Sequence, residues 1–123
     1  MNSKQGTAGY FALIVGAFLL VDGIWGMFST HTFGILTTNE MHAASHLVLG
    51  ALGVYTGLTR NARIWCLIYG PIVLLVGILR FVPGVRDLIV EMMNINYAFA
   101  IFNIVAGLAA IVIARTAQTI NKT

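Results

Sequence analysis

The sequence predicts an all-α integral membrane protein built as a bundle of four transmembrane helices. Of its 123 residues, 59% are hydrophobic and only 9% are charged, whereas soluble domains average roughly half and a quarter. So few ionic side chains cannot build a water-facing surface. Four apolar runs approach the roughly 20 residues that a helix needs to cross a bilayer. Because backbone polar groups in lipid must be satisfied internally, runs of this length indicate helices.

The four runs comprise residues 10–28, 42–59, 64–82 and 95–114. We expect residues 1–123 to form a single membrane domain. The first run is too long for the apolar core of a signal peptide, and no small-residue cleavage site follows it, so we expect a retained span. Pro71 is expected to kink the third helix. Because the connection TRNAR is short, the second and third helices should be antiparallel neighbours.

Basic residues in the connections predict the orientation, since Lys and Arg gather on the cytoplasmic side. Five of them fall on one side of the membrane: Lys4, Arg60, Arg63, Arg115 and Lys122. Only Arg80 and Arg86 fall on the other side, so both termini are expected in the cytoplasm. Residues 83–94 carry apolar side chains at helical spacing opposite charged ones, which is typical of a short interfacial helix.

A faint internal repeat suggests a duplicated helical hairpin. The stretch HLVLGALGVYTGLTR, which begins at His46, resembles NIVAGLAAIVIAR, which begins at Asn103. This alignment pairs Gly50 with Gly107. Repeats in parallel orientation are a known way to build membrane bundles.

Small residues recur inside the predicted helices at positions that suit close packing. Small side chains let helix backbones approach one another, and packing is the main force that joins helices in lipid. The glycines expected at these contacts are Gly16, Gly50, Gly53, Gly57 and Gly107.

Polar side chains inside the runs are expensive in lipid and tend to face the bundle interior. The predicted topology places one such residue from each helix at a similar depth below the non-cytoplasmic surface: Asp22, His46, Arg80 and Asn103. We expect them to form one polar cluster. Its simplest role is a buried hydrogen-bond network that fixes the bundle, at about 1 kcal/mol per contact.

The segment NEMHAASHLVLGALG offers a second role for this region, because His42 and His46 lie one helical turn apart on one face. Two imidazoles at this spacing could bind zinc, copper or iron, completed by Glu40, His31 or Asp22. A tetrapyrrole on one histidine is the other possibility. The two neighbours could not bind both faces of a single haem.

Other function classes find little support in the sequence. The net charge of +3 comes without a basic patch interleaved with aromatic residues, so nucleic acid is not an expected partner. Neither a G-x-S-x-G elbow nor a glycine-rich phosphate loop is present, and we expect no enzyme. Cys66 is the only cysteine, which excludes an intrachain disulfide.

The same segment resembles a bacterial family of small four-helix membrane proteins that is known only as a domain of unknown function. The resemblance rests on Asn39, then His42 and His46, three hydrophobic residues and Gly50, at the opening of the second helix. Members carry a related pattern at the opening of the fourth helix, where this chain has Asn103 in place of a histidine. The resemblance implies the fold and a location in a bacterial inner membrane or a cyanobacterial thylakoid. It draws attention to the histidines, but it supplies no activity.

Together these observations lead to two functional expectations. The first is a non-enzymatic membrane protein that acts as an accessory subunit of a larger complex or as a homo-oligomer. The alternative is a metal- or tetrapyrrole-binding protein, including an accessory subunit of a photosynthetic or respiratory complex, which uses His42 and His46.

Overall fold

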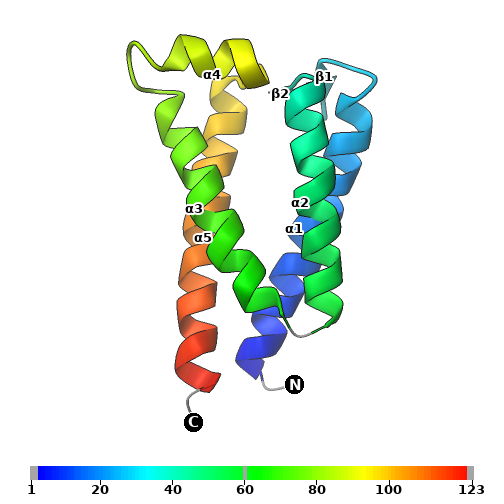
Figure 1. Cartoon of the computed structure of the whole chain (residues 1–123), viewed down its shortest axis with the longest axis vertical. Coiled ribbons are helices and arrows are strands. Elements are labelled where there is room, and N and C mark those ends of the chain that lie inside the picture. The colour runs from blue at the N-terminus through cyan, green and yellow to red at the C-terminus, as the bar shows by residue number, and fades with distance from the viewer. Residues whose placement is uncertain (1–2, 60, 122–123) are drawn as a thin grey trace.

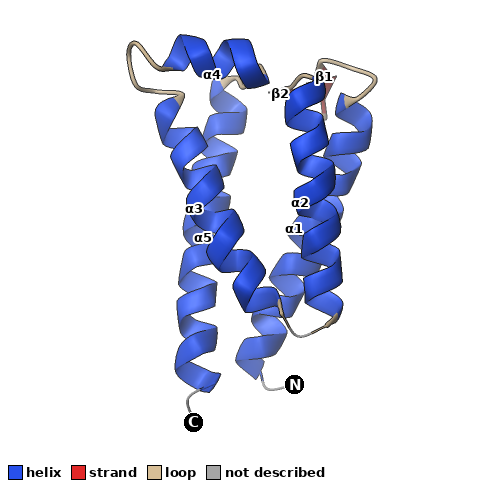
Figure 2. Cartoon of the chain, in the orientation of Figure 1, coloured by secondary structure: helices blue, strands red, loops and turns tan. Residues whose placement is uncertain are grey.

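The computed structural model describes residues 3–59 and 61–121, and the side chains of residues 6–59 and 61–116. Within these residues the chain forms five helices and one minimal β-hairpin (Figures 1 and 2). In chain order the elements are α1 (Ser3–Gly26), β1 (His31–Thr32), β2 (Leu36–Thr37), α2 (Glu40–Leu58), α3 (Ala62–Leu79), α4 (Arg86–Met93) and α5 (Tyr97–Asn121). The expected all-α class is therefore confirmed.

Three helices are long and apolar enough to cross a membrane. These spans are Gly6–Gly26, Ala62–Leu79 and Tyr97–Thr116. Helix α2 has 19 residues but is not among them, since it carries two histidines, a serine and a threonine among its apolar residues. The fold is thus compatible with a membrane protein. Helix α3 continues through Pro71 without interruption.

The long helices run up and down as two antiparallel pairs, α1 with α2 and α3 with α5 (Figure 1). Helix α4 lies across the end of the second pair, within the segment predicted to form a short amphipathic helix. The β-hairpin lies at the same end, and both described ends of the chain lie at the other. The hairpin, with Thr32 paired to Leu36, was not predicted.

Glycine contacts join the helices within each pair. A Cβ atom placed on Gly50 would lie 2.7 Å from the carbonyl oxygen of Gly16. The second pair repeats this contact, because a Cβ atom on Gly107 would lie 2.7 Å from the carbonyl oxygen of Gly70. Real side chains do not tolerate such distances, so glycine is what allows each pair to pack backbone against backbone.

The match between the two pairs extends along their length, which supports the predicted repeat. Gly23 packs on the carbonyl of Ala43, as Gly77 packs on that of Ala100. Asn39 caps α2 by accepting a hydrogen bond from the third residue on, and Asn96 does the same for α5. The first helices of the two pairs, α1 and α3, run in the same direction (Figure 1). This is the parallel arrangement of repeats.

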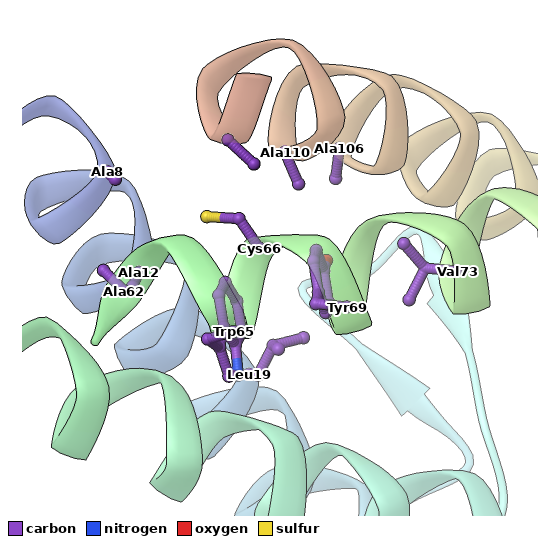
Figure 3. Close-up of a cluster of buried hydrophobic side chains, with 11 residues drawn as sticks. Ala8, Ala12, Leu19, Ala62, Trp65, Cys66, Tyr69, Val73, Ala106 and Ala110 are labelled. Carbon is purple, nitrogen blue, oxygen red and sulfur yellow. The ribbon is translucent and has the colours of Figure 1, made fainter. Parts of the chain in front are cut away.

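The two pairs meet in a core of small and aromatic side chains, shown in Figure 3. Alanines from α1, α3 and α5 surround Cys66, which is fully buried. Trp65 stacks on Tyr69 with ring centroids 4.5 Å apart, and its indole N–H donates to the carbonyl of Leu49 at 2.9 Å. A second cluster, which includes Ile89 of α4 and Phe99 of α5, lies near the hairpin end.

Candidate functional site

The most polar part of the interior is an ion pair between α1 and α2. His46 Nδ1 lies 2.7 Å from Asp22 Oδ2, and both side chains are buried. Asp22 Oδ1 accepts a second hydrogen bond, at 2.5 Å, from the hydroxyl of Thr32 in β1. Each carboxylate oxygen therefore has a donor, as a buried charge requires.

Local structure at the start of α2 places the histidines. Asn39 is the N-cap, and its side-chain oxygen accepts a hydrogen bond from the backbone N–H of His42 at 2.9 Å. This cap fixes the first turn of α2 and thereby the direction of both imidazoles. The rings of His42 and His46 lie side by side, with centroids 4.3 Å apart, as their spacing predicts.

Phe99 from α5 closes the site. Its ring centroid lies 4.6 Å from that of His42 and 5.2 Å from that of His46. His42 also interacts with the backbone of Met93, while its Nδ1 has no hydrogen-bond partner. The site thus holds one paired and one partly unpaired imidazole beneath an aromatic ring.

The structure does not bring all four residues of the expected cluster together. Asn103 is buried on α5, where it faces α3: a Cβ atom on Gly77 would lie 3.2 Å from the Cβ of Asn103. Arg80 points elsewhere, because its Nε donates to the carbonyl of Ile95 at 2.6 Å and its guanidinium lies over the ring of Tyr97. The expectation for Arg80 is corrected: depth alone placed it in the cluster, whereas its direction takes it to the surface.

Two of the expected metal ligands, His31 and Glu40, are exposed and do not join the buried pair of histidines. His31 is exposed and pairs with the hydroxyl of Thr30 at 3.1 Å. Glu40 is exposed at the start of α2, where it lines an open groove with Asn39 and Met41. Across the described parts of the chain, no three His, Cys, Asp or Glu side chains come close enough to hold a metal ion.

A tetrapyrrole does not fit the arrangement either. Phe99 packs against both imidazole rings, and the hydrogen bond of His46 Nδ1 to Asp22 leaves only Nε2 of His46 for a metal. His42 and His46 are only 2% and 3% exposed, so a flat macrocycle could reach them only if α5 moved away. The geometry therefore favours a closed polar network over a cofactor pocket.

The five expected packing glycines all lie at helix contacts. Gly16 and Gly50 face each other, and Gly107 faces Gly70, as described above. A Cβ atom on Gly53 would lie 2.9 Å from the Trp65 ring, and one on Gly57 would lie 2.7 Å from Leu13.

Sequence reasoning missed two members of the site, Thr32 and Phe99. Thr32 comes from a two-residue strand, which is too short to show a periodicity. Phe99 had a usable signal, because it follows Asn96 as His42 follows Asn39 in the repeat. An alignment of these caps pairs Phe99 with His42.

Comparison with known proteins gives one result. Neither the curated proteins nor the solved structures contain a match to this chain. A family model, described as domain of unknown function DUF4383, matches residues 9–116. This range includes every residue of the site and nearly all of the four long helices, so the chain belongs to the DUF4383 family, as the resemblance at the start of the second helix implied.

Proposed function

We propose that the chain is a non-enzymatic integral membrane protein in which all four long helices, α2 included, cross the bilayer. Both termini lie in the cytoplasm, and the protein acts as an accessory subunit of a larger membrane complex or as a homo-oligomer. The Asp22–His46 pair stabilises the contact between α1 and α2 and takes no part in a reaction.

One observation carries the membrane part of the proposal: many large apolar side chains face outward, whereas several polar side chains within the helices are buried. On α2, Val48 and Leu52 are 60% and 49% exposed, whereas His46 is buried. On α5, Val105 is 63% exposed while Asn103 is buried. In water, exposing this much apolar surface would be unfavourable. In lipid it is favourable, because apolar side chains contact hydrocarbon while polar groups find hydrogen-bond partners inside the bundle. The outward face of α2 supports its inclusion among the spans.

The distribution of basic residues supports the proposed orientation. Arg63 and Arg115 lie at the end of the bundle that carries the described chain ends, and Arg80 and Arg86 lie at the other end, beside acidic residues of α4. Of the remaining basic residues, Arg60 and Lys122 lie outside the described residues, as does the side chain of Lys4. The excess of Lys and Arg at the terminal end therefore rests on the sequence, and it supports a cytoplasmic location for that end.

The packing of the terminal half of the bundle favours a structural role over transport or catalysis. Ala8, Ala12, Cys66 and Ala110 are fully buried and pack in one apolar cluster. A transport path needs polar groups at successive depths, and this half provides a packed apolar interior instead. Cys66 lies inside that cluster (Figure 3), away from the imidazoles that could activate a nucleophile.

Purification in a mild detergent tests the proposal. We expect the protein to elute with a larger membrane complex, identified by mass spectrometry, or as a homo-oligomer by light scattering. A monomer without a stable partner would contradict the accessory role. The same sample reports on the alternative: stoichiometric metal or a visible absorbance band, lost in His46→Ala and kept in Val48→Ala, would replace this proposal by a cofactor-binding function.

A further inference from the structure

A charged groove lies at the α4 end of the bundle, apart from the histidine site. It has a volume of about 440 Å³ and is lined by Arg80, Arg86, Asp87, Val90, Glu91 and Tyr97. Small-molecule sites occupy roughly 300–1,000 Å³, so the groove is of a suitable size for a small polar group. Two guanidinium groups and two carboxylates thus share one open site.

These four charges do not neutralise one another directly. Among the described residues, no nitrogen of Arg80 or Arg86 lies within 4.0 Å of a carboxylate oxygen of Asp87 or Glu91. Opposite charges that line one groove without pairing are a preformed site for a ligand that carries both signs, because such a ligand can contact each charge in turn.

Arg80 is held in place for such a ligand. Its Nε donates to the carbonyl of Ile95 at 2.6 Å, and its guanidinium carbon lies 4.2 Å from the centroid of the Tyr97 ring. Tyr97 itself stacks on Phe81, with centroids 5.3 Å apart. A guanidinium has five N–H donors, so these contacts fix the group and leave its terminal nitrogens for a phosphate, which matches guanidinium geometry well.

The surface next to the groove is apolar. Ile78 and Leu75 on α3 are 46% and 56% exposed, and Ile101 on α5 is 55% exposed. These side chains continue from the groove along the bundle. A ligand whose head fills the groove would therefore lay any hydrocarbon tails against α3 and α5.

We propose that this groove binds the headgroup of a zwitterionic phospholipid with a primary ammonium group, of the phosphatidylethanolamine type. The phosphate lies between Arg80 and Arg86, the ammonium donates to Asp87 and Glu91, and the acyl chains lie on α3 and α5. The inference rests on the proposed membrane embedding. The ammonium N–H donors matter, because carboxylates accept charge-assisted hydrogen bonds from them and a choline group has none to give.

Native mass spectrometry of the delipidated full-length protein in detergent tests the inference. The probes are phosphatidylethanolamine, phosphatidylcholine and phosphatidylglycerol with identical acyl chains. We expect the ethanolamine lipid to bind about tenfold more tightly than either of the others, which corresponds to about 1.4 kcal/mol. Equal binding of the three lipids would overturn the proposal.

Substitutions separate the two halves of the groove. Arg80→Gln with Arg86→Gln should weaken the binding of all three lipids, because each of them carries the phosphate that the arginines contact. Asp87→Asn with Glu91→Gln should reverse the lipid preference in favour of phosphatidylglycerol, because only the cationic half remains. Arg63→Gln is the matched control, since Arg63 lies at the opposite end of α3, where its Nε donates to the carbonyl of Ala114. If the arginine pair left the lipid affinities unchanged, or the carboxylate pair left the lipid preference unchanged, the site would be rejected.

Failure of this inference can be told apart from failure of the proposed function. Alkaline carbonate extraction of membranes reports only on embedding. A chain that stays in the membrane and shows no lipid preference refutes the headgroup site alone, whereas a chain released into the soluble fraction refutes both.

Discussion

Asp22 shows how a single acidic residue can be kept in an apolar bundle. Its two carboxylate oxygens accept hydrogen bonds from His46 on α2 and from Thr32 on β1. One residue thereby ties three elements at the same end of the molecule. An unpaired carboxylate at this position would destabilise the fold, because a buried charge without hydrogen-bond partners loses its hydration without compensation.

The Asp22–His46 pair should therefore behave as a unit. His46→Leu removes one partner and leaves a buried carboxylate, which we expect to cost about 3 kcal/mol of stability. Asp22→Leu together with His46→Leu removes both hydrogen-bonding partners and should cost less than His46→Leu alone, since two apolar side chains can replace a buried pair. The measurement is thermal unfolding in detergent, followed by the fluorescence of Trp25 and Trp65.

Val48→Leu is the control for this cycle, because Val48 lies on the same helix but is 60% exposed. It should leave the unfolding temperature close to that of the original protein. Asp22→Leu alone completes the cycle. If the stability lost by the double variant equalled the sum of the losses in the two single variants, the two residues would not form a coupled pair.

The sequence placed Asp22 and His46 in one layer, since depth and helix polarity put both at a similar level, and the structure shows that they pair. Arg80 has a similar depth, yet a long cationic side chain can reach outward, and here it lies over Tyr97. Depth follows from counting residues, whereas direction around the helix depends on how the helices rotate against each other. That rotation is set by contacts between distant segments, which a single sequence does not display.

At the scale of elements, glycine contacts decide which helices pair. Gly16 with Gly50 joins α1 to α2, and Gly70 with Gly107 joins α3 to α5. The sequence made Gly16, Gly50 and Gly107 visible as small residues at helical spacing, whereas the contact of Gly70 was not predicted. It did not reveal the hairpin of β1 and β2, whose two-residue strands have no periodicity and whose turn uses positive φ angles at Phe33 and Gly34.

Adding a side chain at Gly50 should separate α1 from α2. A Cβ atom there would lie 2.7 Å from Gly16 O and 2.8 Å from the backbone N of Leu20, and neither backbone atom can move aside. We expect Gly50→Val to destabilise the protein by about 1–3 kcal/mol or more, as overpacking does. Thermal unfolding in detergent is the measurement.

Gly6→Ala is the matched control, because a Cβ atom at Gly6 lies 4.0 Å from its nearest neighbour, in the Tyr10 ring. Alanine is the better helix former, so this variant should be as stable as the original protein or slightly more so. A Gly50→Val protein that unfolds at the same temperature as Gly6→Ala would show that the backbone contact does not hold the pair together.

At the scale of the whole molecule, the two helix pairs resemble each other in their asparagine caps and their glycine contacts. They differ at the histidine site. The Nδ2 of Asn39 donates to the carbonyl of Met92, and the Nδ2 of Asn96 donates to the carbonyl of Ile35, both at 2.7 Å. Each cap thus reaches into the connection of the other half. The histidines occur in the first half only, since Phe99 occupies the position equivalent to His42.

This symmetry has a consequence for topology. Parallel repeats with an even number of crossings place both connections within the pairs on one side of the membrane and the remaining connection on the other. We therefore expect Ile35 and Pro83 to face the non-cytoplasmic side and Thr59 to face the cytoplasm. All three are exposed or lie in exposed loops, so a cysteine at any of them is accessible to a reagent on its own side.

Cysteine labelling of intact cells with a membrane-impermeant maleimide checks this arrangement. Ile35→Cys and Pro83→Cys should react in intact cells, whereas Thr59→Cys should react only after the membrane is permeabilised. The original protein is its own control, because Cys66 is fully buried and should stay unlabelled under both conditions.

Labelling of Thr59→Cys in intact cells would show that α2 does not cross the membrane or that the orientation is inverted, and Ile35→Cys distinguishes these outcomes. If it still reacts, Ile35 and Thr59 share a side and α2 fails to cross, whereas protection until permeabilisation means that the whole bundle is turned over.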